Sequence, residues 1–274
     1  MTVVIETSPL GKSCQYKAEY APELLFPLPR KEKRDELGIT ESQLPFHGRD
    51  LWYGYELSWL GPKGKPEVRI AQFEIPCESR CLIESKSFKL YLNSFNQTRF
   101  DDAVAVKHCL EKDLSEATEA KVLVTLFTLP EFEQLGIQSV PGICIDEQDV
   151  EVTTYQYNPD LLASREGQIT ETLCSHLLKS NCLVTGQPDW GTLVISYQGE
   201  AIDHGSLLQY ICSFRQHQEF HEQCVERIYS DLQKRFKLSS LTVYAQYVRR
   251  GGLDINPWRS SESKSPEALR FVRQ

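Results

Sequence analysis

A cysteine and an aspartate seven residues apart flank a turn in the stretch "SNCLVTGQPDWGTLVISY", residues 180–197. Gly186 begins this turn and Pro188 rigidifies it. The apolar runs "CLVT" and "GTLVISY" predict strands that return the chain past itself and bring Cys182 and Asp189 close together. A thiol beside a carboxyl group suits covalent catalysis. The alternative interpretation is a buried core cysteine followed by a turn aspartate.

A nucleophilic thiol needs a nearby base, because the pKa of free cysteine is about 8.5. His221 and Asp189 are the candidates for that base, and the three groups together would also suit a thiol hydrolase. Glu222 follows His221 at the start of a predicted helix, where the dipole favours a carboxylate. It is therefore either a helix-start charge or an acceptor of two N–H bonds from a guanine-like ring.

The stretch "ESKSFK" (84–89) precedes a predicted helix and offers an anion site. Ser85 and Lys86 at the helix entrance could hold a phosphate. No Gly-x-Gly-x-x-Gly motif follows a strand, so a Rossmann cradle is excluded. A dinucleotide would need another kind of groove, with Lys86 and Arg250 as its phosphate partners.

Metal binding is the other common use of cysteine and histidine. Cys77 and Cys81 have a spacing that some zinc sites use, but no second Cys/His pair at suitable spacing accompanies them. We therefore expect no metal.

The elements that must position these residues follow one order in the first half of the chain. A hairpin is predicted over 51–60 and 66–75, then helices over 85–96 and 100–117, then a strand over 121–129. The second half is predicted to repeat this order, with strands near 149–157, 180–185 and 192–198, helices over 205–216 and 221–236, and a strand over 240–248.

Identities accompany this repeated pattern. Ser87-x3-Tyr91-x2-Ser94-Phe95 reappears as Ser206-x3-Tyr210-x2-Ser213-Phe214. The repeat favours an internal duplication and an α+β fold, with antiparallel sheets and helices packed on one face. The halves differ in chemistry, since the first is basic at "ESKSFK" and the second carries the thiol and the acid. A single site where two units or two subunits meet would unite them.

Composition restricts the class of partner and the compartment. A net charge of −8 argues against a nucleic-acid backbone as the main partner. We interpret the charged run "RKEKR" (30–34) as a solvated face after a proline-containing extended arm. No window has the roughly 18 apolar residues of a membrane span. The first residues lack an export signal, so the nine cysteines are expected as thiols in the cytoplasm.

Together these motifs resemble one family, the NADPH-dependent 7-cyano-7-deazaguanine reductases of queuosine biosynthesis (the QueF nitrile reductases). The family hallmark Glu-(Ser/Leu)-Lys-(Ser/Ala)-x-Lys-(Tyr/Leu)-(Tyr/Phe/Trp) is present as "ESKSFKLY", residues 84–91. The Cys-x6-Asp signature runs from Cys182 to Asp189, and the His-Glu pair is His221-Glu222. The resemblance covers nearly the whole chain and is greatest to the long, two-domain subfamily.

For the fold, the resemblance implies a tunnelling fold (T-fold) of ββααββ units that associate into barrels. An extended arm would occupy residues 1–45, the first unit 46–145 and the second 146–274. A homodimer would complete the assembly, without nucleic acid or membrane as a direct partner.

For the chemistry, the resemblance implies that Cys182 adds to the nitrile carbon as a thiolate and forms a thioimidate. Asp189 would protonate the nitrogen, and two NADPH molecules would reduce the adduct to an amine. The implied residues are Cys182, Asp189 and His221 for catalysis, Ile83, Glu84, Ser85, His221 and Glu222 for the substrate, and Ser85, Lys86, Arg250 and Gly251 for NADPH.

Two other classes remain in view from the sequence. One is a thiol hydrolase or cyclohydrolase of a purine- or pterin-like base on the same fold. The other is a catalytically silent base-binding protein, which the intact Cys182 and Asp189 disfavour. Only the reductase would consume NADPH.

Overall fold

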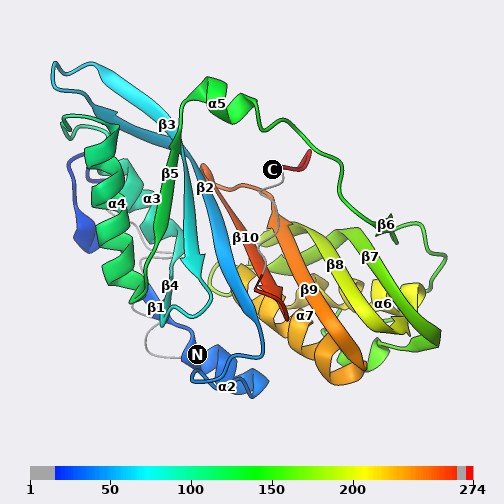
Figure 1. The fold of residues 1–274 in the computed structure, drawn as a ribbon. Coiled ribbons are helices and arrows are strands. Elements are labelled where there is room, and N and C mark those ends of the chain that lie inside the picture. Colours follow the sequence, from blue (N-terminus) through cyan, green and yellow to red (C-terminus); the bar gives the residue numbers. More distant parts are fainter. Residues whose placement is uncertain (1–15, 264–269, 274) are drawn as a thin grey trace. The chain divides into compact units, whose positions relative to one another are not determined.

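The computed structural model describes residues 16–263 and 270–273 (Figure 1). The chain forms two compact units by its contacts. Unit 1 comprises the described residues up to Glu36 together with Arg49–Gly136 and Arg249–Asp254, and unit 2 comprises Leu37–Gly48, Ile137–Val248 and the described residues from Ile255 onward. The boundaries predicted after residues 45 and 145 remain a prediction.

Unit 1 is built around an antiparallel sheet with helices beside it (Figure 1). The sheet contains β2 (His47–Leu60), β3 (Pro66–Pro76) and β5 (Leu123–Phe127), while β1 (Pro27–Pro29) and β4 (Cys81–Ile83) form a separate antiparallel pair. The helices are η1 (Pro22–Leu24), α2 (Lys31–Leu37), α3 (Ser85–Asn93), α4 (Ala103–Thr118) and α5 (Leu129–Glu133). Strand β2 and helix α2 each have residues in both units. Strand β3 pairs with both β2 and β5, which confirms the predicted hairpin and the strand that follows the helices.

The helices of unit 1 begin where acidic side chains can cap them. Glu84 accepts hydrogen bonds from the amides of Lys86 and Ser87, and Asp102 accepts one from Ala105. A carboxylate at this position satisfies amides that have no partner within the helix and interacts favourably with the helix dipole. Both predicted helices are confirmed.

Unit 2 repeats the arrangement with longer strands. Its elements are β6 (Ile143–Cys144), η2 (Pro159–Leu161), β7 (Ser164–Asn181), β8 (Pro188–Ile202), α6 (His204–Ser213), η3 (Phe214–Gln216), α7 (His221–Arg235), β9 (Leu238–Tyr247) and β10 (Leu253–Ser260), the last of which starts in unit 1. The strands from β7 to β10 pair antiparallel in chain order, and β6 adds to β7 in parallel. Helices α6 and α7 lie on one side of β7, β8 and β9 (Figure 1). The α+β class with antiparallel-rich sheets is confirmed.

Two strand predictions in this unit were wrong. Residues 149–157 form no strand, and residues 182–187 form a turn. The strand before that turn is instead β7, which is exposed at its first residues and buried only further along. Because β7 carries polar residues on its solvated side, as antiparallel strands do, its sequence lacks a continuous apolar run.

The charged run at 30–34 was also misjudged. Arg30 and Arg34 are buried, while Lys31 is exposed. Arg30 pairs with Asp50 at 2.5 Å, and Arg34 donates to the carbonyl of Cys77 at 2.7 Å. A guanidinium can be buried when a carboxylate and carbonyls accept its fixed donors. The arm expected to be extended therefore contains β1 and α2, and part of it is packed.

The predicted duplication has a counterpart in hydrogen bonding. The Tyr91 hydroxyl donates to Asp113 at 2.6 Å in unit 1, and the Tyr210 hydroxyl donates to Asp231 at 2.6 Å in unit 2. Each bond joins the first long helix of its unit to the second. The repeated tyrosines thus fix the same helix pair twice.

The repeated serines have the same role in both units. Ser87 accepts a hydrogen bond from the amide of Phe26, and Ser206 accepts one from the amide of Ala163, both at 3.0 Å. Each serine ties an earlier segment of its own unit to the first turn of a helix. The identities noticed in the sequence are therefore structural, and both copies retain them.

No helix in the described part of the chain is long and apolar enough to cross a membrane.

Candidate active site

The turn that begins with Cys182 is closed by two backbone hydrogen bonds. The Cys182 amide donates to the Gln187 carbonyl at 2.8 Å, and the Gly186 amide donates to the Cys182 carbonyl at 3.0 Å. Gly186 has a φ of +66°, a conformation that glycine adopts without a steric penalty. Cys182 is 7% exposed although the tip of the turn is open to solvent. The backbone thus holds the thiol at the rim of the sheet.

Asp189 lies in β8, beside the end of the strand that leads to this thiol. Asp189 pairs directly with Ser180 across β7 and β8, and Cys182 follows Ser180 by two residues. Directly paired residues share a face, and so do residues two apart along a strand. Asp189 is 4% exposed. The predicted proximity is therefore consistent with the register, although β7 ends before Cys182.

A tyrosine that the sequence motifs do not reveal lies on the same face of the sheet as Asp189. Tyr247 of β9 pairs with Gly191 of β8. A Cβ on Gly191 would come within 3.3 Å of the Tyr247 ring, so glycine leaves room for that ring. Tyr247 is almost fully buried. The β9 strand was predicted, but its register against Gly191 cannot be read from its residues.

His221 begins helix α7 and faces Asp189. Its Nε2 lies 3.6 Å from the Asp189 carboxylate, and its ring packs edge-on against Tyr247 with centroids 4.1 Å apart. Glu222 lies in the first turn of α7 and is 2% exposed. A carboxylate in that turn is stabilised by the positive end of the helix. The structure therefore brings Asp189 and His221 together and buries Glu222 at the same helix start.

The start of α7 is linked to the strand that carries the thiol. The Asn181 amide donates to the His217 carbonyl at 2.8 Å, and the Glu219 amide donates to the Asn181 carbonyl at 3.2 Å. The Lys179 ammonium donates to the Asn181 side chain at 2.5 Å. These bonds hold the segment before α7 against the end of β7, and so they set the position of His221 relative to Cys182.

Glu219 is a buried carboxylate that the sequence did not reveal. Arg227 binds it with two hydrogen bonds of 2.7 and 2.9 Å, and His217 lies 2.9 Å away. Burial acts to raise the pKa of Glu219, but the bonds from Arg227 and His217 outweigh it and hold that pKa below its usual range. The Glu219 amide donates to the carbonyl of Asn181, at the end of β7, just as the Phe100 amide of unit 1 donates to the carbonyl of Leu60, at the end of β2. Glu219 and Phe100 therefore occupy equivalent positions in the two units. No spacing rule connects these residues in the sequence.

The groups around Tyr247 are poorly solvated. Burial raises the pKa of the Cys224 thiol to about 12. It also raises the pKa of Tyr247 well above its ordinary value, with Cys224 and Asp189 as further causes. Both groups therefore remain protonated near neutral pH. Charges in such a low-dielectric place interact more strongly than they would in water.

Unit 1 supplies the remaining predicted residues. Ile83 ends β4, Glu84 caps α3, and Ser85 and Lys86 form the first turn of that helix. Burial raises the pKa of Glu84 above its ordinary value, against the opposing effect of the Lys86 and Ser87 amides. The Glu84 carboxylate already occupies those two amides. A phosphate here would have to be bound by side chains and not by these backbone donors.

The turn that carries Arg250 and Gly251 contacts the same helix. Lys89 donates to the Gly251 carbonyl at 2.6 Å, and Arg250 and Leu253 exchange backbone hydrogen bonds. Lys89 lies one helical turn after Lys86, so the two ammonium groups project from neighbouring positions. The four residues predicted to bind a dinucleotide thus all belong to unit 1. Lys89 is an additional cation, recognisable from its spacing to Lys86.

Unit 1 contains a counterpart of the cysteine turn that is one residue shorter and lacks the thiol. The Gly61 amide donates to the Lys65 carbonyl at 2.9 Å, and the Gly64 amide donates to the Gly61 carbonyl at 2.8 Å. Gly61 therefore stands where unit 2 has Cys182. A turn at this position therefore belongs to the repeated scaffold, whereas the thiol at its first residue belongs to unit 2.

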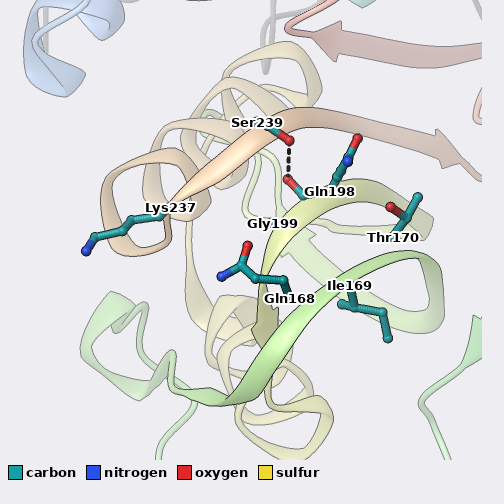
Figure 2. Close-up of a pocket in the computed structure, with 7 residues that line it drawn as sticks. All are labelled: Gln168, Ile169, Thr170, Gln198, Gly199, Lys237 and Ser239. Carbon is teal, nitrogen blue, oxygen red and sulfur yellow. Dashed lines mark hydrogen bonds between the residues drawn. The ribbon is translucent and has the colours of Figure 1, made fainter.

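A separate hollow in unit 2 is formed by the ends of β7, β8 and β9 (Figure 2). Figure 2 shows Ser239 bonded to the Gln198 carbonyl, at 3.1 Å, while the Lys237 side chain points away. The lining residues are Gln168, Ile169, Thr170, Gln198, Gly199, Lys237 and Ser239, and none of the predicted site residues is among them. This hollow is therefore not the site predicted from the motifs.

Comparison with known protein families gives two matches. Residues 16–126 match the family described as nitrile reductase, 7-cyano-7-deazaguanine-reductase N-term. Residues 188–266 match the family described as QueF-like protein. The first match contains the α3 entrance, and the second contains Asp189, His221, Glu222 and the turn at Arg250 and Gly251.

Proposed function

Because this chain belongs to the QueF nitrile reductase family, with both family parts in one chain, we propose that it reduces the nitrile of 7-cyano-7-deazaguanine to an aminomethyl group at the expense of NADPH. The family supports the coarser role of an oxidoreductase of queuosine biosynthesis. The cofactor, the covalent intermediate and the residue roles are the finer parts of this proposal.

The observation that carries the proposal is the arrangement around the cysteine turn. Asp189 pairs with Ser180, two residues before Cys182, and His221 lies 3.6 Å from the Asp189 carboxylate. A nucleophile, an acid and an imidazole on one rigid frame suit covalent addition with proton transfer. Family membership then selects a nitrile as the group to be attacked.

In the proposed addition, the Cys182 sulfur forms a bond to the nitrile carbon while one π bond of the nitrile breaks. The electron pair of that π bond moves to nitrogen, which takes a proton, so that a neutral thioimidate results. Asp189 is the proposed donor of the proton, and His221 orients Asp189 or restores its proton. The low exposure of Cys182 and Asp189 excludes much of the water that would hydrolyse reactive intermediates.

The residues of unit 1 fit a dinucleotide phosphate. Lys86 and Arg250 are the proposed partners, and Lys89 adds a third cation where it contacts Gly251. The Lys86 and Ser87 amides already donate to Glu84, so the ammonium groups of the lysines and the guanidinium of Arg250 would have to bind the phosphate. NADPH supplies hydride when bound, one equivalent for each of the two reductions.

The deazaguanine ring is the proposed ligand of Glu222. A buried carboxylate at a helix start can accept two N–H bonds from the edge of a guanine-like ring, and His221 beside it would help to orient the substrate. Ile83, Glu84 and Ser85 are proposed to line the base.

We further propose that the repeated ββαα order reflects tandem T-fold units that complete a barrel in a homodimer. The net charge of −8 supports a small-molecule substrate and not direct nucleic-acid binding. The many thiols support a cytoplasmic location.

The ratio of cofactor to nitrile consumed tests the proposed function. Nicotinamide absorbance followed with purified chain and 7-cyano-7-deazaguanine should show two NADPH oxidised per nitrile. The Cys182, Asp189 and His221 set would also suit a thiol hydrolase, and that activity would leave NADPH unchanged. Nitrile loss without NADPH oxidation would therefore replace the reductase with the hydrolase, and binding without turnover would indicate a silent base-binding protein.

A further inference from the structure

A second group of metal-ligating side chains lies in unit 2, away from the cysteine turn. Strand β6 lies beside β7 in parallel register, so that Cys144 is opposite Cys174. The ligand atoms of Cys144, Asp146 and His176 all lie within 4.8 Å of one another. Cys144 is exposed, and the other two are partly buried. No spacing motif reveals this cluster, because its members come from segments about 30 residues apart.

Asp146 is held in place by β7. Its two carboxylate oxygens accept hydrogen bonds from the Ser175 hydroxyl at 2.6 Å and from the His176 amide at 2.9 Å. The Ile145 amide donates to the Cys174 carbonyl at 3.0 Å and anchors the segment just before Asp146. A carboxylate oriented in this way retains lone pairs for a cation.

His176 is oriented by a second neighbour. Its Nδ1 lies 3.2 Å from the hydroxyl of Thr192, a buried residue of β8. When Nδ1 donates to that hydroxyl, Nε2 carries the lone pair that a metal would use. Histidines that bind metals usually donate their other N–H to such a partner. The register of β7 against β8 also shifts between Ser175 and Leu178, the interval that contains His176. Bulges of this kind change the direction of side chains and are frequent beside functional sites.

A second thiol lies opposite Cys144. Cys174 pairs with Cys144 across β6 and β7 but is buried, whereas Cys144 is exposed. Cys144 is therefore the more accessible of the two thiols.

We propose that Cys144, Asp146 and His176 bind a divalent cation of the zinc class, with water in the fourth position. Sulfur, imidazole nitrogen and carboxylate oxygen are the ligands that Zn²⁺ prefers. Around a single Zn²⁺ such ligand atoms are about 3–4 Å apart, a separation that small side-chain rotations would reach from the observed cluster. A thiolate and a carboxylate would balance the charge of the ion. The bound ion would pin residues 143–146 to β7.

Cobalt titration of the full chain tests this site without using catalysis. With thiols kept reduced by a phosphine, Co²⁺ should give a saturable thiolate-to-metal absorption band at one equivalent per chain, and Zn²⁺ should abolish the band. Cys144→Ser and His176→Ala should each remove the band, and Asp146→Asn should weaken binding at least tenfold. Zn²⁺ should also raise the melting temperature of the wild type but not of Cys144→Ser.

Two matched controls separate this site from the other Cys/Asp/His set. Cys182→Ala removes a thiol from the cysteine turn and should keep the band, as should His108→Ala on the exposed side of α4. A band lost in Cys182→Ala but kept in Cys144→Ser would overturn the proposal, because the ion would then lie with Asp189 and His221. Absence of any saturable band in reduced wild type would overturn it as well. Neither outcome bears on the proposed nitrile reduction.

Discussion

The His221 imidazole lies 3.6 Å from the Asp189 carboxylate, and the ring of Tyr247 packs edge-on against that imidazole. His221 comes from the start of a helix, whereas Asp189 comes from the strand that follows the cysteine turn. The contact with Tyr247 restricts the rotation of the imidazole beside that carboxylate. Substitutions at Asp189 and at Cys182 test the acid and the thiol separately.

Cys182 should form a stable adduct when hydride is withheld. Wild-type protein given 7-cyano-7-deazaguanine without NADPH should gain one substrate mass per chain by intact-protein mass spectrometry, because nothing can reduce the thioimidate. Cys182→Ala should gain none. Asp189→Ala keeps the thiol but loses the proton donor, so its adduct should form slowly or incompletely.

The other cysteines are an internal control for that experiment. Peptide mapping should place the adduct within "SNCLVTGQPDW". An adduct on Cys174 or Cys212 would refute the assignment, and a wild type without any adduct would favour direct hydride attack on a non-covalent nitrile.

Glu222→Gln should weaken binding of the nitrile substrate. The variant keeps the shape of the side chain but replaces an acceptor with a donor, and losing a buried charged hydrogen bond typically costs about 2–5 kcal/mol. Affinity measured by calorimetry should therefore fall more than tenfold. Glu116→Gln, on an exposed part of α4, is the matched control. Equal affinities in the two variants would leave Glu222 as a helix-start charge.

Lys86→Ala and Arg250→Ala should raise the Michaelis constant for NADPH several-fold and leave nitrile affinity nearly unchanged. Each variant removes a cation proposed to meet a phosphate, and both leave the Cys182 thiol and the Asp189 carboxyl group in place. Lys112→Ala removes an exposed ammonium from α4 and should change neither quantity. A collapse of nitrile affinity in Lys86→Ala would instead place Lys86 on the substrate.

Arg30→Ala should destabilise the protein far more than Lys31→Ala, although the two residues are adjacent. Arg30 is paired with Asp50 in the interior, and removing one partner of a buried pair typically costs about 3–5 kcal/mol. Lys31 pairs with Asp35 on the surface, where such substitutions usually cost less than about 0.5 kcal/mol. Urea unfolding measures both, and similar midpoints for the two variants would contradict the burial of Arg30.

Glu219→Gln should lower stability and also change its dependence on pH. The pKa of Glu219 is lowered in the fold by Arg227 and His217 from an ordinary value of 4.5. Its contribution is thus fully present above about pH 4.5 and is lost as the pH falls through the lower folded value. Wild type should lose stability on that acid side more steeply than Glu219→Gln does. Glu133→Gln, an exposed change, should keep the wild-type slope in chemical unfolding.

Much of the fold could be predicted where local pattern and tertiary packing agree. The helices that start at Ser85 and Ala103 have acidic caps before them and apolar residues at helical spacing, and both formed as expected. The hairpin of β2 and β3 has strong strand formers on both sides of a glycine turn. In these elements the caps, the spacing of apolar residues and the turn glycines act within a few residues, so they can be recognised from the sequence alone.

Other features depended on partners far away in the chain. Residues 149–157 alternate as a strand would, yet they form none, because pairing requires a neighbour that composition does not specify. From the sequence, Arg30 was interpreted as a solvated charge. In the structure its guanidinium donates to Asp50, which lies twenty residues later in the chain. The long strand β7 was not predicted because 12 of its 18 residues are polar.

The candidate site also contains residues that local sequence predicts and residues that depend on distant partners. Motif residues such as Cys182 and Glu222 were recognisable by type and spacing. The groups that hold them were not, since Tyr247 reaches His221 only through the register of β9 against β8. Glu219 contacts Arg227 through the fold of the segment before α7, which no motif encodes.

The duplicated turn makes each half of the molecule a reference for the other. Gly61 and Cys182 begin corresponding loops, of which the one in unit 1 is one residue shorter, so a cysteine substituted for Gly61 would have related backbone support without an Asp189 or a His221 of its own. The reactivity of two cysteines in one chain could then be compared under identical conditions. Any difference in reactivity between the two thiols would measure the contribution of Asp189 and His221 beyond that of the loop backbone.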